Sequence, residues 1–189
     1  MKETIIDFFS NLISVILGIV ITFAVQGMID RAHDRQEVRS ALELVRTELI
    51  SNREDIAVVS DYLEQELASA RYLLDHAGAL NACPADTVRY HQGIVHADVS
   101  IALPHDAQEL LKMSSLFPKI GDNALSMKII RAYDSCQLMV ENINRHVLAR
   151  DAQAGDLPQW LLDHDARHFT DAADIDQAIT AINVFLRRK

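Results

Sequence analysis

A run of eighteen uncharged residues, Phe8 to Val25, constrains this chain more than any other feature. An α-helix needs about 20 predominantly apolar residues to cross the hydrocarbon core of a bilayer. The run therefore predicts a tail and a transmembrane helix within residues 1–29. The remainder, residues 30–189, is then a soluble region held at the membrane.

Two other interpretations of this run stay open. It could be a cleaved signal peptide, with Lys2 as the basic region and Thr22-Phe23-Ala24 as a small-x-small cleavage site. Against this, Glu3 and Asp7 offset the charge of Lys2, and the helical pattern continues past the cleavage point. It could also be a buried core helix, but so long an apolar segment is unusual beside a small polar domain. The sequence favours a membrane anchor.

The basic residues that flank the run indicate its orientation. Lys2 stands on the N-terminal side, whereas Arg31, Arg35 and Arg39 follow on the C-terminal side. Because cytoplasmic flanks carry the excess of Lys and Arg, we expect the soluble region in the cytoplasm.

The charge balance of the whole chain restricts its partners. The formal net charge is −9, with 27 acidic against 18 basic residues. Nucleic acid binding needs clustered Lys and Arg to replace counterions, so this acidic balance leads us to expect no nucleic acid partner. Cys83 and Cys136 show no metal-type spacing, and two such cysteines fit a reducing compartment, although one disulfide stays open as an alternative.

A long amphipathic helix is predicted over about residues 30–77, since no glycine or proline interrupts the chain between Gly27 and Gly78. Its apolar residues recur at steps of three and four, which indicates one buried face. They are Val38, Leu42, Val45, Leu49, Ile56, Val59, Leu63, Leu67 and Leu74. Asn52 falls on this face and either fixes a register, as in coiled coils, or leans towards solvent. Continuity with the span would make the helix a rigid stalk.

Further helices are predicted from caps, proline breaks and apolar periodicity. They cover about residues 86–102, 106–117, 122–150, 158–168 and 171–187. No segment alternates β-branched residues as a strand would. The predicted fold class is all-α: a transmembrane helix continues into a long amphipathic helix, which packs with the others in an antiparallel bundle.

The span carries its polar and small residues on one side. Members of this stripe lie three or four positions apart: Asp7, Asn11, Ser14, Gly18, Thr22 and Gln26. Membrane helices pack closely through such residues, so the stripe predicts association with a second copy or with another membrane protein. Two alternatives stay open: the polarity near the helix ends could be due to chance, or the stripe could line a pore formed by a ring of subunits.

Catalytic and metal motifs are missing from the sequence. His164 and His168 stand four apart near three aspartates, a spacing with which a helix can present two metal ligands, but surface capping and solvation are the favoured explanation. No nucleophile motif or phosphate-binding loop occurs, so we expect no enzyme and no cofactor. Tyr133 and Trp160 are expected in the core or, alternatively, in a ligand pocket between helices.

Two segments carry a family resemblance: Leu17 to Gln26, followed by a charged helix with Glu48-Leu49-Ile50-Ser51-Asn52, and Leu110 to Asp134 with its Tyr133-Asp134 pair. They resemble a group of uncharacterised bacterial membrane proteins with one N-terminal span and a helical soluble part. The chain departs from the group at His96-Ala97-Asp98, where a tryptophan is frequent. The resemblance implies topology alone, with a single span in the bacterial inner membrane.

These patterns lead to one main functional hypothesis. The chain is expected to be a non-enzymatic, membrane-anchored helical scaffold or accessory subunit that associates through its span and stalk. A sensory or ligand-binding bundle that signals through the span is the alternative, and a ring-forming membrane pore or effector is a third.

Overall fold

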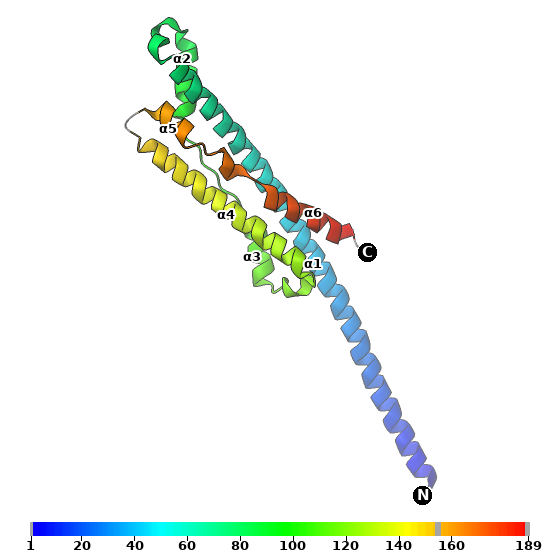
Figure 1. Cartoon of the computed structure of the whole chain (residues 1–189). Coiled ribbons are helices and arrows are strands. Elements are labelled where there is room, and N and C mark those ends of the chain that lie inside the picture. The colour runs from blue at the N-terminus through cyan, green and yellow to red at the C-terminus, as the bar shows by residue number, and fades with distance from the viewer. Residues whose placement is uncertain (1, 154–155, 188–189) are drawn as a thin grey trace.

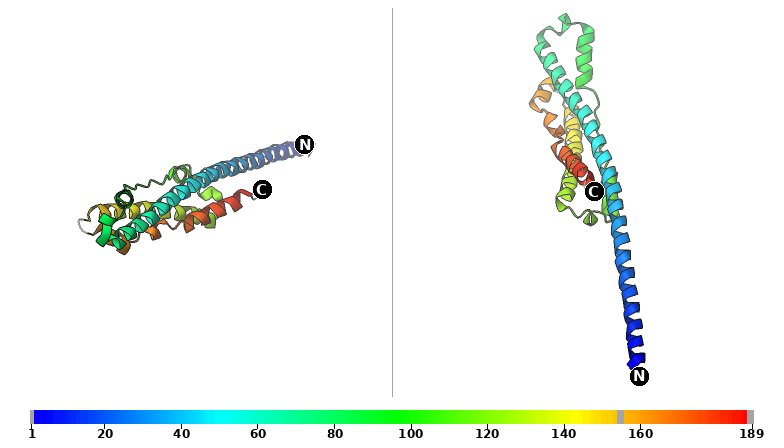
Figure 2. Two further views of the ribbon diagram at one scale, coloured as in Figure 1. Left: turned by 90° about the horizontal axis from the view of Figure 1, so that it is seen from above. Right: turned by 90° about the vertical axis from the view of Figure 1, so that its right-hand side faces the viewer.

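One helix, α1 (Lys2–Asp75), runs through the whole molecule and forms the spine of an elongated all-α structure (Figure 1). The computed structural model describes residues 2–153 and 156–187, with side chains from Ile16 onward. Among the described residues, the remaining helices pack on α1 from about Asp34 onward, so its first part projects alone (Figure 2). The predicted continuity between the apolar run and the long amphipathic helix is confirmed.

The elements that follow α1 are short except for one. They are η1 (Ala77–Ala82), α2 (Ala85–Val95), α3 (Asp106–Met113), η2 (Pro118–Ile120), α4 (Asn123–Asp151), α5 (Leu157–Asp163), η3 (Arg167–Thr170) and α6 (Ala173–Arg187). The described part of the chain contains no strand.

The predicted apolar face of α1 forms the core. All its members from Val38 to Leu67 are buried, and they meet the buried faces of α4 and α6. At the end of the face, Leu73 is buried in place of Leu74, which is only half-buried. A second, smaller core joins Leu73 to α2 and α5.

Helix directions in the bundle are mixed. On α4, Cys136 lies beside Asn52 and His146 beside Glu66, so α4 runs parallel to α1. The contacts of α6 run the other way, from Asp176 beside Arg53 to Leu186 beside Arg39, so α6 is antiparallel to both. The predicted antiparallel packing therefore holds for α6, whereas α4 lies parallel to the spine because the chain returns along α1 before α4 begins.

The returning chain is an irregular segment, residues 97–105, where a helix reaching residue 102 was expected. Its carbonyl oxygens are taken by side chains instead of by helical amides. The Tyr62 hydroxyl donates to the Ala97 oxygen (3.2 Å), and the Asn52 amide donates to the Pro104 oxygen (2.9 Å). Asn52 is fully buried, so the solvent-leaning interpretation is wrong and this side chain holds the return segment against α1.

The helix expected over residues 158–168 is also broken. Helix α5 ends at Asp163, and η3 starts at Arg167. Between them, the Asp165 carboxylate accepts from the Arg167 backbone N–H (3.0 Å), a local turn that competes with helix continuation.

Candidate functional site

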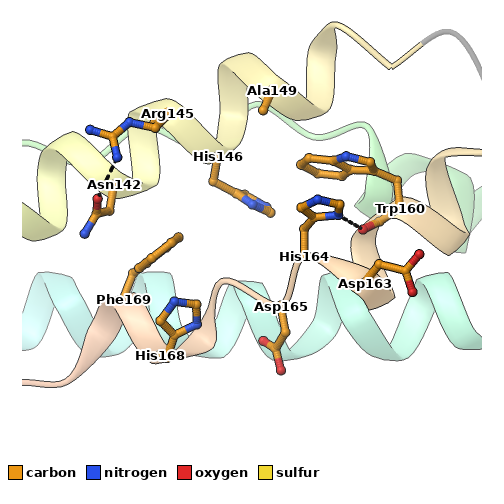
Figure 3. A pocket seen from close by; sticks show the side chains of 10 residues that line it. All are labelled: Asn142, Arg145, His146, Ala149, Trp160, Asp163, His164, Asp165, His168 and Phe169. Carbon is orange, nitrogen blue, oxygen red and sulfur yellow. Dashed lines mark hydrogen bonds between the residues drawn. The ribbon is translucent and has the colours of Figure 1, made fainter.

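A pocket of about 290 Å³ lies between α4 and the α5–η3 turn (Figure 3). Its lining comes from three stretches: Asn142, Arg145, His146 and Ala149 of α4, Trp160 and Asp163 of α5, and His164, Asp165, His168 and Phe169 of the turn and η3. Its size is at the lower end for small-molecule sites.

Aromatic rings make up much of its wall. The Trp160 indole and the His164 imidazole are stacked, with centroids 4.5 Å apart and an interplanar angle of 12°. The His146 ring also lies beside the indole, with centroids 5.5 Å apart (Figure 3). Such a set presents flat apolar faces beside ring nitrogens, which suits a small planar ring compound.

Behind this wall lies a buried ionic cluster made of Glu66, His146 and Arg150, whose side chains are 2 %, 5 % and 3 % exposed. The Glu66 carboxylate accepts from His146 Nε2 (3.3 Å) and from Arg150 Nη1 (3.3 Å). Because Nε2 donates to the Glu66 carboxylate, Nδ1 is the second ring nitrogen of His146, and the described residues show no hydrogen bond to it.

Arg150 ties the cluster to the return segment. Its Nη1 donates to the Ala97 oxygen (2.8 Å), while Nε and Nη2 donate to the exposed Asp151 carboxylate (3.0 and 2.9 Å). Burial alone would lower the pKa of this guanidinium, but its hydrogen bonds to the Asp151 and Glu66 carboxylates outweigh burial and raise the pKa. Burial, with the nearby Glu66 charge, also raises the pKa of Tyr62 to about 12.

The two predicted metal candidates do not sit on one helix. His164 caps the end of α5, where its Nδ1 donates to the Trp160 oxygen (2.9 Å), and His168 lies on η3 beside Phe169. The turn between them is fixed by Asp165, whose pKa falls to about 2 because Arg167 hydrogen-bonds to it. The assumption of helical i, i+4 spacing was wrong. No group of three or more metal-ligating side chains occurs in the described part of the chain.

The described members of the span stripe lie on bare helix. Gly18, Thr22 and Gln26 are exposed, and the Thr22 hydroxyl donates to the Gly18 oxygen within the helix (2.8 Å). Asp7, Asn11 and Ser14 lie outside the side chains that the structure describes. The stripe as an association surface stays a prediction.

Other singled-out residues are structural. Tyr133 is buried in the core and its hydroxyl donates to Glu48, which together with burial raises its pKa. Cys136 is buried, and burial raises its pKa to about 11. Trp160, in contrast, is only half-buried and lines the pocket, the alternative that the sequence left open.

Sequence reasoning missed the buried cluster. A signal for it exists, because Glu66 continues the apolar spacing of α1 after Val59 and Leu63, and His146 and Arg150 continue that of α4. Polar residues in apolar register on two helices indicate a buried polar contact.

Comparisons with known protein families, with curated proteins and with solved structures found no match to this chain.

Proposed function

We propose that this protein is a non-enzymatic, membrane-anchored helical scaffold or accessory subunit. The observation that carries the proposal is that the two parts of α1 differ in burial. The first part is long and apolar enough to span a membrane and is not buried by the rest of the protein, whereas the second part contributes its apolar face to the core of the folded body. A single rigid helix would thus hold the body at a fixed place relative to the bilayer.

The length of the apolar part suits a bilayer. Met28 and Ile29 are exposed, and the uncharged run continues through them until Asp30. Phe8 to Ile29 spans about 33 Å of helix at about 1.5 Å per residue, close to a hydrocarbon core of about 30 Å. The bare apolar residues would then face lipid tails.

Association through the span completes the proposal. Gly18 and Thr22 allow close approach of another helix, and the exposed Gln26 amide offers hydrogen bonds at the edge of the span. The partner would be a second copy or another spanning protein in the bacterial inner membrane, with the body on the cytoplasmic side as the Arg residues after the span favour.

A membrane two-hybrid assay of the span, together with gentle solubilisation of the full chain, tests this function. The Ser14→Leu, Gly18→Ile double variant should lose association, whereas a matched Val20→Leu change off the stripe should keep it. Equal signals from all three spans, with a monomeric full chain and no co-purifying protein, would contradict the proposal. A large closed ring in detergent would favour the pore hypothesis instead.

The pocket favours a second candidate function, that of a ligand sensor. Its wall residue His146 contacts Glu66, which belongs to the same helix as the span, so a bound ring compound would touch a side chain linked to α1. Fluorescence of Trp160, the single tryptophan, offers a direct screen with small planar ring compounds. A sensor would be supported by a saturable change in Trp160 fluorescence on ligand addition. This change should persist in the exposed-surface variant Leu148→Ala and be lost in His164→Ala. The absence of any saturable binder would count against it.

A further inference from the structure

Two imidazole rings of the candidate pocket, His146 and His164, each keep one nitrogen to which the described residues make no hydrogen bond. Both rings lie beside the Trp160 indole, at centroid distances of 5.5 Å and 4.5 Å. His146 is only 7 % exposed. Because a buried polar atom without a partner costs free energy, a ligand atom that pairs with this nitrogen would bind favourably.

The partners of the two rings determine which nitrogen carries the hydrogen. The ionised Glu66 carboxylate can only accept, so His146 Nε2 donates across their 3.3 Å contact. The Trp160 carbonyl oxygen also only accepts, so His164 Nδ1 donates in their 2.9 Å bond. In the neutral rings, Nδ1 of His146 and Nε2 of His164 are therefore acceptors. Glu66 already has Arg150 as a counter-ion, so it does not require a charged His146.

The α4 side of the pocket offers donors instead. Arg145 is exposed, and its guanidinium makes one long contact to the Asn142 Oδ1 atom (3.4 Å) and no ion pair within the described part of the chain. The two carboxylates in the lining are already engaged, since Asp165 binds Arg167 (2.6 Å) and Asp163 accepts from a side-chain amide (3.0 Å). This rim therefore suits an oxygen acceptor of a ligand better than a cation.

The shape of the pocket suits a flat compound. In Figure 3 the His146 and Phe169 side chains point from α4 and η3 into the space between these elements. A volume of about 290 Å³, with an aromatic wall, is appropriate for one or two fused rings. Since the described residues provide no cluster of three metal-ligating side chains, the two acceptor nitrogens favour N–H groups over a metal ion.

We propose that this pocket binds a planar heterocycle that carries both amino or ring N–H groups and a carbonyl oxygen, as guanine and pterin do. Its N–H groups donate to His146 Nδ1 and His164 Nε2, its oxygen accepts from Arg145, and its ring rests against Phe169. This inference rests on the second candidate function, the ligand sensor, because it names the chemical class of the ligand. It does not depend on the membrane anchor.

Calorimetric titration of the full chain in detergent micelles tests this assignment, at pH 8, a condition that favours neutral histidine side chains. The probes are 9-methylguanine and 1,9-dimethylhypoxanthine, which keeps the purine ring and the carbonyl group but has no N–H donor. The His164→Phe variant keeps a ring beside Trp160 and removes the acceptor nitrogen, and it should fold because His164 is exposed. His105→Phe, at a histidine that is 61 % exposed and lies outside this pocket, is the matched control.

The expected result is that the wild-type chain binds 9-methylguanine at least about tenfold more tightly than the dimethyl compound, because the latter leaves a buried acceptor unpaired. His164→Phe should weaken 9-methylguanine about tenfold, and His105→Phe should not change it. Arg145→Gln should weaken both purines by a similar factor, since both keep the carbonyl oxygen.

Equal wild-type affinities for the two purines would overturn the recognition of N–H donors and leave the sensor candidate standing. An affinity for 9-methylguanine that His164→Phe does not change would place its binding elsewhere and overturn the assignment to this pocket. Wild-type affinities in Arg145→Gln would overturn the carbonyl contact. If neither purine binds, the inference is overturned, and the sensor candidate falls with it only when the wider screen of planar ring compounds also finds no binder.

Discussion

Removing the buried Glu66 carboxylate should destabilise the folded body strongly. The Glu66→Ala variant leaves the Arg150 guanidinium in a site where it is 3 % exposed, and it removes the acceptor of His146. Breaking one partner of a buried ion pair costs about 3–5 kcal/mol, because the other charge stays desolvated. Glu66 is therefore expected to hold the pocket wall and the return segment together.

The lower end of that range applies here. Arg150 keeps two hydrogen bonds to Asp151 and one to the Ala97 oxygen after the change. We expect a loss of about 3 kcal/mol in the free energy of unfolding, which lowers the urea midpoint by about 1.5 M at a slope of about 2 kcal/mol/M. Glu66→Gln keeps a polar acceptor and should cost about 1–2 kcal/mol.

Urea unfolding in detergent micelles, followed by the fluorescence of Trp160, measures this loss in the body. Trp160 is suitable because its indole lies 5.5 Å from the His146 ring. The exposed Glu54→Ala variant on α1 is the matched control, with an expected change within about 0.5 kcal/mol. A Glu66→Ala midpoint equal to that of Glu54→Ala would refute the buried cluster as a stabilising contact.

Three further predictions follow from local geometry. At neutral pH a maleimide should label Cys83 and spare Cys136 until denaturant is added, because Cys136 is buried and its pKa is raised to about 11; equal native rates would contradict this. Stability should be full below about pH 9 and fall towards pH 12, since folded Cys136 and Tyr62 keep protons that the unfolded chain releases; a urea midpoint that does not decrease between about pH 8 and pH 10.5 would count against it. Gly121→Ala should cost about 1 kcal/mol because its φ is +68°, whereas Gly93→Ala inside α2 should stabilise by a few tenths to about 1 kcal/mol, and thermal unfolding that shows the same sign for both would be inconsistent with the backbone argument.

The helices were predictable wherever periodicity and punctuation agree. The apolar spacing of α1 from Val38 to Leu67 is strict, and α4 begins after Gly121, with the Asp122 side chain accepting from the Leu125 backbone N–H (3.0 Å). Local signals of this kind are contained within a few residues, so the sequence suffices for them.

The return segment could not be predicted in the same way. Its conformation depends on side chains of α1 and α4 that are remote in sequence, such as Asn52, Tyr62 and Arg150, which donate to its carbonyl oxygens. Periodicity reports whether a segment has an apolar face, but not which distant donors compete for its backbone. For the same reason the direction of α4 relative to α1 could not be predicted from the sequence.

The candidate site was predicted only in its exposed parts. Trp160, His164 and His168 stand out in the sequence as unusual residue types, and all three line the pocket. The assumption that one helix carries both histidines failed because Asp165 makes a turn with Arg167. Glu66 and Arg150 are common residue types, and only the pairing of two helix faces shows that they are buried together.

A distance measurement between two spin labels tests the central claim, that one unbroken helix carries the body out of the bilayer. Labels at Phe23→Cys and Val58→Cys, both exposed positions of α1, are placed in the full chain without its native cysteines and in lipid nanodiscs. Thirty-five helical positions predict a single narrow distance of about 53 Å between the two sites. A broad or clearly shorter distribution in nanodiscs would show that α1 bends between span and body, and would contradict the account.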